Sequence, residues 1–141
     1  MLVPAAVLVL IALAAIAVDS AIVLLAQRQA GDVAAAAAND AAGAAVSERA
    51  FYGGGTVDID PARATQLVAD AVAARGTGLD LVGPPAVVVS GRQVCVTVQA
   101  RVRYLFSPAV PGAPRTRTVT ARAAATAVEG QGAVPSASNL C

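Results

Sequence analysis

The first eighteen residues, Met1–Val18, read MLVPAAVLVLIALAAIAV and carry neither a charge nor a strongly polar side chain. Asp19 and Ser20 interrupt this apolar run, which then resumes through residues 21–26. A run of roughly 18 or more apolar residues is long enough to cross about 30 Å of hydrocarbon as a helix. The segment 1–26 is therefore predicted to be a transmembrane helix.

The chain keeps its helical character beyond this segment, because residues 27–50 are rich in alanine, the residue with the highest helix propensity. An unbroken helix over both segments would be roughly 70 Å long. Residues 27–50 are predicted to form an alanine-rich helical stalk. Small side chains let another helix approach closely, so we expect the stalk to pack against its own head or against a neighbouring subunit.

The position of Asp19 leaves two alternatives open. An ionisable group inside a membrane span is expensive and usually faces a partner or an interface. Alternatively, the span ends at Val18 and Asp19 lies among the lipid headgroups. The sequence favours neither alternative.

A retained anchor is favoured over a cleaved signal peptide. A signal peptide carries a basic region ahead of an apolar stretch of about 7–15 residues. Here no basic residue precedes the apolar run, and the run is longer. The positive-inside rule gives no support for the expected orientation either, because Arg28 is the first basic residue and follows the span.

The remaining residues predict a small α+β head. Glycines 53–55 end the rod, Asp60 and Pro61 are typical of a helix start, and Gly76 is typical of its end. After residue 76 the apolar period changes to two, which predicts strands near 79–81, 86–89, 93–106 and 117–128, with a proline-rich loop at 107–114.

One helix covering the valine face of a three- to four-stranded antiparallel sheet gives an α+β head over residues 51–129. The predicted order is thus a long transmembrane and stalk helix followed by this head. Residues 130–141, rich in Gly, Ser and Ala, are predicted to be a disordered tail.

Composition argues against several classes of function. The net charge is +1, all ten basic residues are arginine and only four residues are aromatic, which argues against nucleic-acid binding. Histidine, the commonest general base and metal ligand, is absent. The scattered aspartates form no recognisable dyad. We therefore expect no enzyme activity, no metal, no cofactor and no small-molecule substrate.

The two cysteines, Cys95 in the longest predicted strand and Cys141 at the last position, allow two interpretations. In an oxidising compartment a disulfide would tie the tail to the sheet. Alternatively, Cys95 is a buried small apolar residue and Cys141 an unpaired terminal thiol, which the sequence alone slightly favours.

Four arginines flank the proline-rich loop, at positions 101, 103, 115 and 117. They would line up across adjacent strands as a basic patch for anionic lipid headgroups or an acidic partner. The solvated face of a sheet is the favoured interpretation of the same residues.

With these elements in place, the chain resembles the TadE/TadG-like proteins of the Flp (tight adherence) pilus system, which are pilin-like membrane proteins found in actinobacteria among others. The resemblance rests on Ala17, Val18 and Asp19 at the end of the apolar run and on residues 29–35, which read QAGDVAA. Family members typically show an apolar anchor, an aspartate and then a Gln-x-x-Asp-Ala-Ala-type helix.

The resemblance implies a minor pilin or pseudopilin-like protein that acts in assembly of a Flp/Tad-type pilus or a related secretion apparatus. It implies a single-pass protein of the cell membrane with an extracytoplasmic head, whose partners are the membrane and other pilin-like proteins. Residues expected to mediate helix packing are Asp19, Gln29, Asp32, Ala34, Ala38 and Ala41. The alternative function is a membrane-tethered extracytoplasmic module that binds an envelope ligand.

Two features depart from the family pattern. Prepilins cut by the system's peptidase carry a glycine before the cut and a glutamate at the fifth mature position. Neither this glycine nor this glutamate precedes the apolar run, and Pro4 lies in the region where they would be expected. We therefore expect either a protein of the uncleaved TadG-type branch or a chain whose leader lies upstream of Met1.

Overall fold

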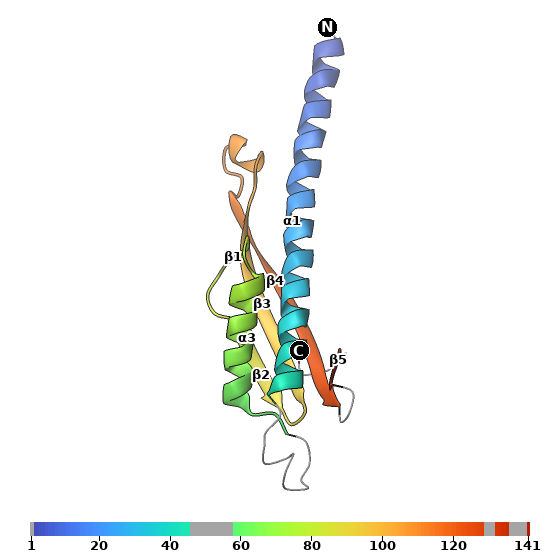
Figure 1. Ribbon diagram of the computed structural model, residues 1–141. Helices are drawn as coiled ribbons and strands as arrows, with labels where there is room; N and C mark the ends of the chain where they lie inside the picture. Colours follow the sequence, from blue (N-terminus) through green and yellow to red (C-terminus); the bar gives the residue numbers. More distant parts are fainter. Residues whose placement is uncertain (1, 46–57, 129–131, 136–140) are drawn as a thin grey trace.

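The molecule is organised around one long N-terminal helix, α1 (Leu2–Ala44), whose second half packs on an antiparallel sheet (Figure 1). The computed structural model describes residues 2–45, 58–128, 132–135 and 141. At 1.5 Å per residue, the 43 residues of α1 span about 65 Å. The predicted end of the rod at glycines 53–55 lies outside the described residues.

The second helix, α3 (Pro61–Arg75), begins and ends where the sequence predicts. The Asp60 carboxylate accepts the backbone N–H groups of Ala62 and Arg63 at 2.9 and 3.3 Å, as an N-cap does. At the other end the N–H of Gly76 donates to the Val72 carbonyl at 2.7 Å. Local capping signals therefore fix this helix.

Within the described residues the sheet contains five strands, all paired antiparallel. They are β1 (Asp80–Leu81), β2 (Ala86–Ser90), β3 (Gln93–Arg103), β4 (Thr116–Val128) and β5 (Gly132–Pro135). Strands β1 and β2 follow one another along one edge of β3, β4 lies along its other edge, and β5 extends β4. The sheet is thus four positions wide, and the predicted α+β fold class is confirmed.

Strand β5 differs from the sequence prediction, which placed residues 130–141 in a disordered tail. Residues 132–135 pair with Ala125–Val128 of β4. Four residues are too few to show the apolar alternation that predicts a strand. The pairing with β4, and not the local sequence, stabilises this strand. The structure describes residues 132–135 and 141 of this tail.

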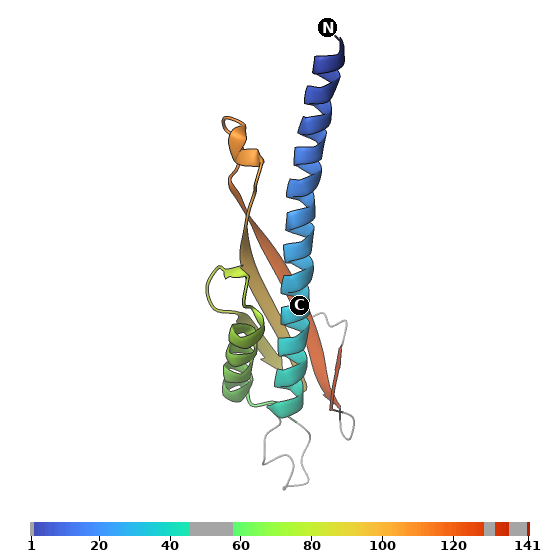
Figure 2. The same ribbon diagram turned by 45° about the horizontal axis from the view of Figure 1, so that its top comes forward.

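The core lies between one face of the sheet and two helices, not the single helix that the sequence predicted. On β3 the alternating residues Val94, Val96 and Val98 are at most 1% exposed. Helix α3 adds Val68 and Val72 to this core. The second half of α1 lies beside α3 on the same face (Figures 1 and 2). The predicted stalk is therefore part of the head over its described residues, up to Ala45.

A smaller apolar cluster continues the core toward the N-terminal end of α1. It joins Ile22, Val23 and Ala26 of α1 to Val102 and Val119 of the sheet. The sequence placed residues 21–26 in the membrane span. In the structure Ile22, Val23 and Ala26 of this segment contact the head, because β3 and β4 extend far enough to reach them, whereas Leu24 and Leu25 are 51% and 64% exposed.

Candidate functional site

The part of α1 that the head does not cover is apolar. From Val3 to Val18 almost every side chain is exposed. The large apolar ones are Val3, Val7, Leu8, Val9, Leu10, Ile11, Leu13, Ile16 and Val18. By length and composition α1 is a candidate for a single membrane span. An exposed apolar surface of this extent marks a region that lipid or another protein covers.

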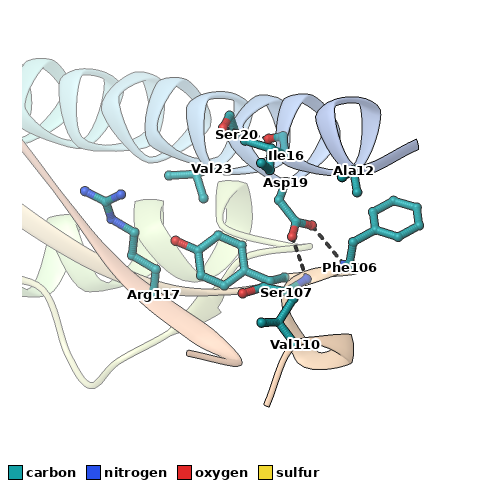
Figure 3. A pocket seen from close by; sticks show the side chains of 11 residues that line it. Ala12, Ile16, Asp19, Ser20, Val23, Phe106, Ser107, Val110 and Arg117 are labelled. Carbon is teal, nitrogen blue, oxygen red and sulfur yellow. Dashed lines mark hydrogen bonds between the residues drawn. The ribbon is translucent and has the colours of Figure 1, made fainter. Parts of the chain in front are cut away.

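Asp19 stands at the boundary between this exposed segment and the head. Its carboxylate accepts the backbone N–H groups of Leu105, Phe106 and Ser107 at 2.8, 3.1 and 2.8 Å. Figure 3 shows the bonds to Phe106 and Ser107. Its side chain is buried, with 7% of the residue exposed. Three successive N–H groups around one carboxylate form an anion-binding nest, so Asp19 ties α1 to the loop that follows β3.

This contact shows what Asp19 faces, and it is compatible with both alternatives that the sequence left open for where the span ends. The residue faces a partner, and that partner is its own head, 86–88 residues further along the chain. The loop that holds it contains the short 3-10 helix η1 (Ser107–Ala109). Because the carboxylate already accepts three N–H groups, the structure gives Asp19 partners within its own chain rather than in a neighbour.

A groove of about 460 Å³ opens between α1 and this loop. Ala12, Ile16 and Asp19 line it from α1, and Phe106 and Val110 line it from the loop (Figure 3). The small side chain of Ala12 leaves the space open. The groove therefore begins where the head ends and runs into the exposed apolar part of α1.

The four arginines flanking the loop do not lie on one face of the sheet. Arg101 and Arg103 are paired with Thr118 and Thr116, whereas Arg117 is paired with the buried Val102. Cross-strand partners point to the same side of a sheet. Arg117 therefore lies on the α1 side and lines the groove, while Arg101 and Arg103 are exposed on the opposite side.

The three alanines expected to mediate assembly lie inside the head. Ala34, Ala38 and Ala41 are fully buried against the head of the same chain. Their small side chains let α1 approach the sheet and α3 closely. Gln29 and Asp32 are exposed. Of the residues that the sequence singled out on α1, these two are the ones left open to another molecule.

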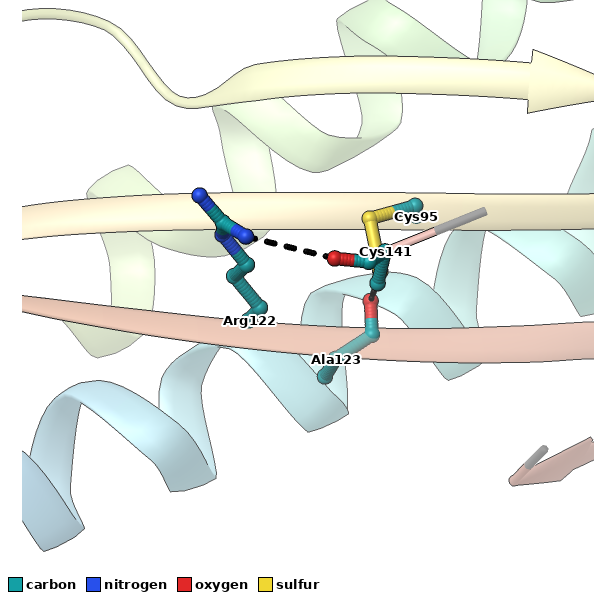
Figure 4. Close-up of a disulfide and its surroundings, with 4 residues drawn as sticks. All are labelled: Cys95, Arg122, Ala123 and Cys141. Carbon is teal, nitrogen blue, oxygen red and sulfur yellow. Dashed lines mark hydrogen bonds between the residues drawn. A yellow bond between two sulfur atoms is a disulfide. The ribbon is translucent and has the colours of Figure 1, made fainter. Parts of the chain in front are cut away.

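Of the two interpretations left open for the cysteines, the structure contains the disulfide between Cys95 and Cys141 (Figure 4). It lies on the sheet face away from the helices, where Cys95 is paired across the strands with Ala124. The Arg122 guanidinium also donates to the Cys141 carbonyl oxygen at 3.3 Å. The end of the chain is thus held against β3 and β4.

Among the described residues no group of three or more His, Cys, Asp or Glu side chains is arranged to hold a metal ion. The residues that sequence reasoning missed are the loop amides around Asp19 and the apolar side chains beside them. The available signal was the run from Tyr104 to Pro114, which carries no charge and lies between two arginines. Comparisons with models of protein families, with curated proteins and with solved structures find no match to this chain.

Proposed function

We propose that this chain is a single-pass, pilin-like membrane protein with an extracytoplasmic head, acting in assembly of a Flp/Tad-type pilus or a related secretion apparatus. The observation that carries the proposal is the division of α1 into an exposed apolar part, Val3–Val18, and a part built into the head. Neighbouring molecules pack through the exposed part. The resemblance of residues 17–19 and 29–35 to TadE/TadG-like proteins suggests the system.

The exposed part of α1 suits lateral packing in a membrane. In water, each exposed Leu or Ile costs about 1.5–3 kcal/mol relative to burial, so this segment requires a cover. Lipid chains are as apolar as leucine side chains. A neighbouring helix can therefore replace lipid around this segment with almost no hydrophobic cost. Alanines at 5, 6, 12, 14, 15 and 17 allow close approach of helices.

The disulfide between Cys95 and Cys141 supports an extracytoplasmic head. Disulfides form and persist in oxidising compartments and are rare in the cytosol. Both cysteines belong to the side of the molecule that α1 would hold outside the bilayer. The disulfide therefore supports an orientation for which the charges flanking the span give no bias.

The assembly surface is narrower than the sequence suggested. Because Ala34, Ala38 and Ala41 are buried in their own head, enlarging them would disturb folding before it tested assembly. We propose that neighbours meet along Val3–Val18, whereas Gln29 and Asp32, although exposed, lie on the part of α1 that is built into the head.

Photocrosslinking along α1 tests this proposal. A photoreactive phenylalanine analogue is placed in turn at Leu8, Leu10, Ile11 and Leu13, which are all exposed, and at Ala35 as an exposed control on the part of α1 built into the head. We expect crosslinked multimers from positions on one side of the helix, recurring every three to four residues. The control should give none.

Membrane-bound protein that gives no multimer from any of these positions would overturn the assembly proposal. It would instead favour the membrane-tethered binding module, in which α1 is only an anchor. The same samples show whether crosslinked partners are copies of this chain or other pilin-like proteins.

A further inference from the structure

The loop between β3 and β4 has the composition of a segment that enters a membrane. Its eleven residues, Tyr104–Pro114, carry no charge. Leu105, Phe106 and Val110 are 66%, 47% and 60% exposed. Clustered large apolar side chains on an exposed loop mark a contact with another apolar phase.

This loop lies beside the apolar part of α1. Phe106 and Val110 face Ala12 and Ile16 across the groove (Figure 3). The hydrogen bonds of Asp19 to the loop amides hold it there. The loop and the N-terminal part of α1 extend from the head in the same direction (Figures 1 and 2). A bilayer that surrounds α1 at Ala12 and Ile16 therefore meets the loop as well.

Most backbone N–H groups of the loop are hydrogen-bonded within the protein, as an environment poor in water requires. Three of its residues are prolines and have no N–H. The N–H of Tyr104 donates to the Arg115 carbonyl, and three more donate to Asp19. Those of Ala109, Val110 and Ala113 donate to carbonyls three residues earlier. Unsatisfied backbone groups are costly in lipid, and this loop has paired nearly all of its donors.

Arginines stand at the base of the loop on both sides of the hairpin. Arg103 and Arg115 flank it in sequence, and Arg117 and Arg101 follow on opposite faces of the sheet. All four are exposed. Basic side chains close to a membrane surface are attracted to anionic headgroups. These four residues, Arg101, Arg103, Arg115 and Arg117, are called the arginine collar. An uncharged apolar loop next to basic side chains matches the order of hydrocarbon and headgroups in a lipid interface.

We propose that the loop Tyr104–Pro114 is a second membrane contact, which inserts Leu105, Phe106 and Val110 into the leaflet on the head side while the arginine collar binds anionic phospholipid headgroups. This inference rests on the membrane anchor of the proposed function. With two contacts, α1 and the loop, the head has a fixed tilt and rotation on the membrane. Its lateral surfaces then face neighbouring subunits in one orientation.

Tryptophan fluorescence in vesicles tests the insertion, since the natural chain has no tryptophan. Three full-length variants, Phe106→Trp, Leu10→Trp and Val88→Trp, are reconstituted with brominated phospholipids, which quench tryptophan on contact. Val88 is the matched control, because it is an exposed apolar residue on β2 near the opposite end of β3 from the loop. We expect Leu10→Trp to be quenched by deeply brominated chains. Phe106→Trp should be quenched by shallow ones with a blue-shifted emission, and Val88→Trp should not be quenched.

The three reporters separate the failure of the inference from the failure of the anchor. Quenching at Leu10→Trp without quenching at Phe106→Trp overturns the loop contact and leaves the anchor standing; a loop covered by another protein or a second copy would give this result. No quenching at Leu10→Trp overturns the anchor itself. If Val88→Trp were quenched as strongly as Phe106→Trp, the head would be lying on the membrane without a specific contact through the loop. That result would overturn the loop contact.

The arginine collar is tested in the Phe106→Trp background. Adding anionic phosphatidylglycerol to phosphatidylcholine vesicles should increase quenching, and Arg103→Gln with Arg115→Gln should remove the increase. Arg63→Gln serves as the control, because Arg63 is exposed near the start of α3, away from the loop. An increase that survives both collar substitutions would overturn the role of the arginines.

Discussion

The disulfide between Cys95 and Cys141 allows a quantitative prediction. The variant Cys141→Ser removes the bond at the exposed end of the chain and leaves Cys95, a buried residue, in place. The two cysteines are 46 residues apart in sequence. In the chain-entropy model, opening a loop of this length returns about 13–14 cal/mol/K to the unfolded state, which is about 4 kcal/mol at 25 °C.

Denaturation by urea in a mild detergent, followed by far-ultraviolet circular dichroism, measures the change. We expect the free energy of unfolding of the head to fall by about 4 kcal/mol in Cys141→Ser. Dithiothreitol should lower the stability of the natural protein by a similar amount and leave the variant unchanged. This thermodynamic cycle separates loss of the bond from any effect of the new serine.

The entropic account would be refuted by a loss of no more than about 0.5 kcal/mol, the usual range for an exposed substitution. Such a result would return the cysteines to the other interpretation of the sequence, a buried small side chain and an unpaired terminal thiol. Insensitivity of the natural protein to dithiothreitol, with the bond shown to be reduced, would lead to the same conclusion.

Three further predictions concern the helices and the loop contact. Ala38→Leu should cost about 1–3 kcal/mol of stability by overpacking the interface between α1 and the head, whereas Ala35→Leu, at an exposed position, should be nearly neutral in the same urea titration. Asp60→Ala should cost about 1 kcal/mol through loss of the α3 N-cap, and Asp60→Asn should recover most of it; equal losses in both variants would contradict the capping role. Asp19→Ala removes the carboxylate that accepts the three loop N–H groups, so hydrogen exchange at these amides, measured by mass spectrometry, should become faster. Ser20→Ala, which removes only a bond within α1, should leave that exchange unchanged, and unchanged exchange in Asp19→Ala would show that the loop does not need the tie.

The elements that the sequence predicts well are those set by local signals. The bounds of α3 follow from Asp60, Pro61 and Gly76, since a cap acts within a few residues of the helix end. Alternation places Val94, Val96 and Val98 on the core face of β3, and the structure buries all three.

The features that the sequence does not predict depend on distant partners. Alanine propensity predicts that residues 27–50 are helical, but it leaves open whether their own head or a neighbouring subunit covers them. Over the described residues, up to Ala45, the structure shows that their own head does. Asp19 meets its three amides 86–88 residues away, which no local pattern encodes. Strand β5 exists through its pairing with β4.

We propose that the apolar part of α1 stays attached to the head and rests in lipid. Alkaline carbonate extraction of membranes from cells that produce the chain, followed by mass spectrometry of both fractions, tests it most directly. We expect the chain to stay in the membrane pellet with Val3–Val18 intact. Recovery of the head in the soluble fraction, shortened by loss of that segment, would contradict it.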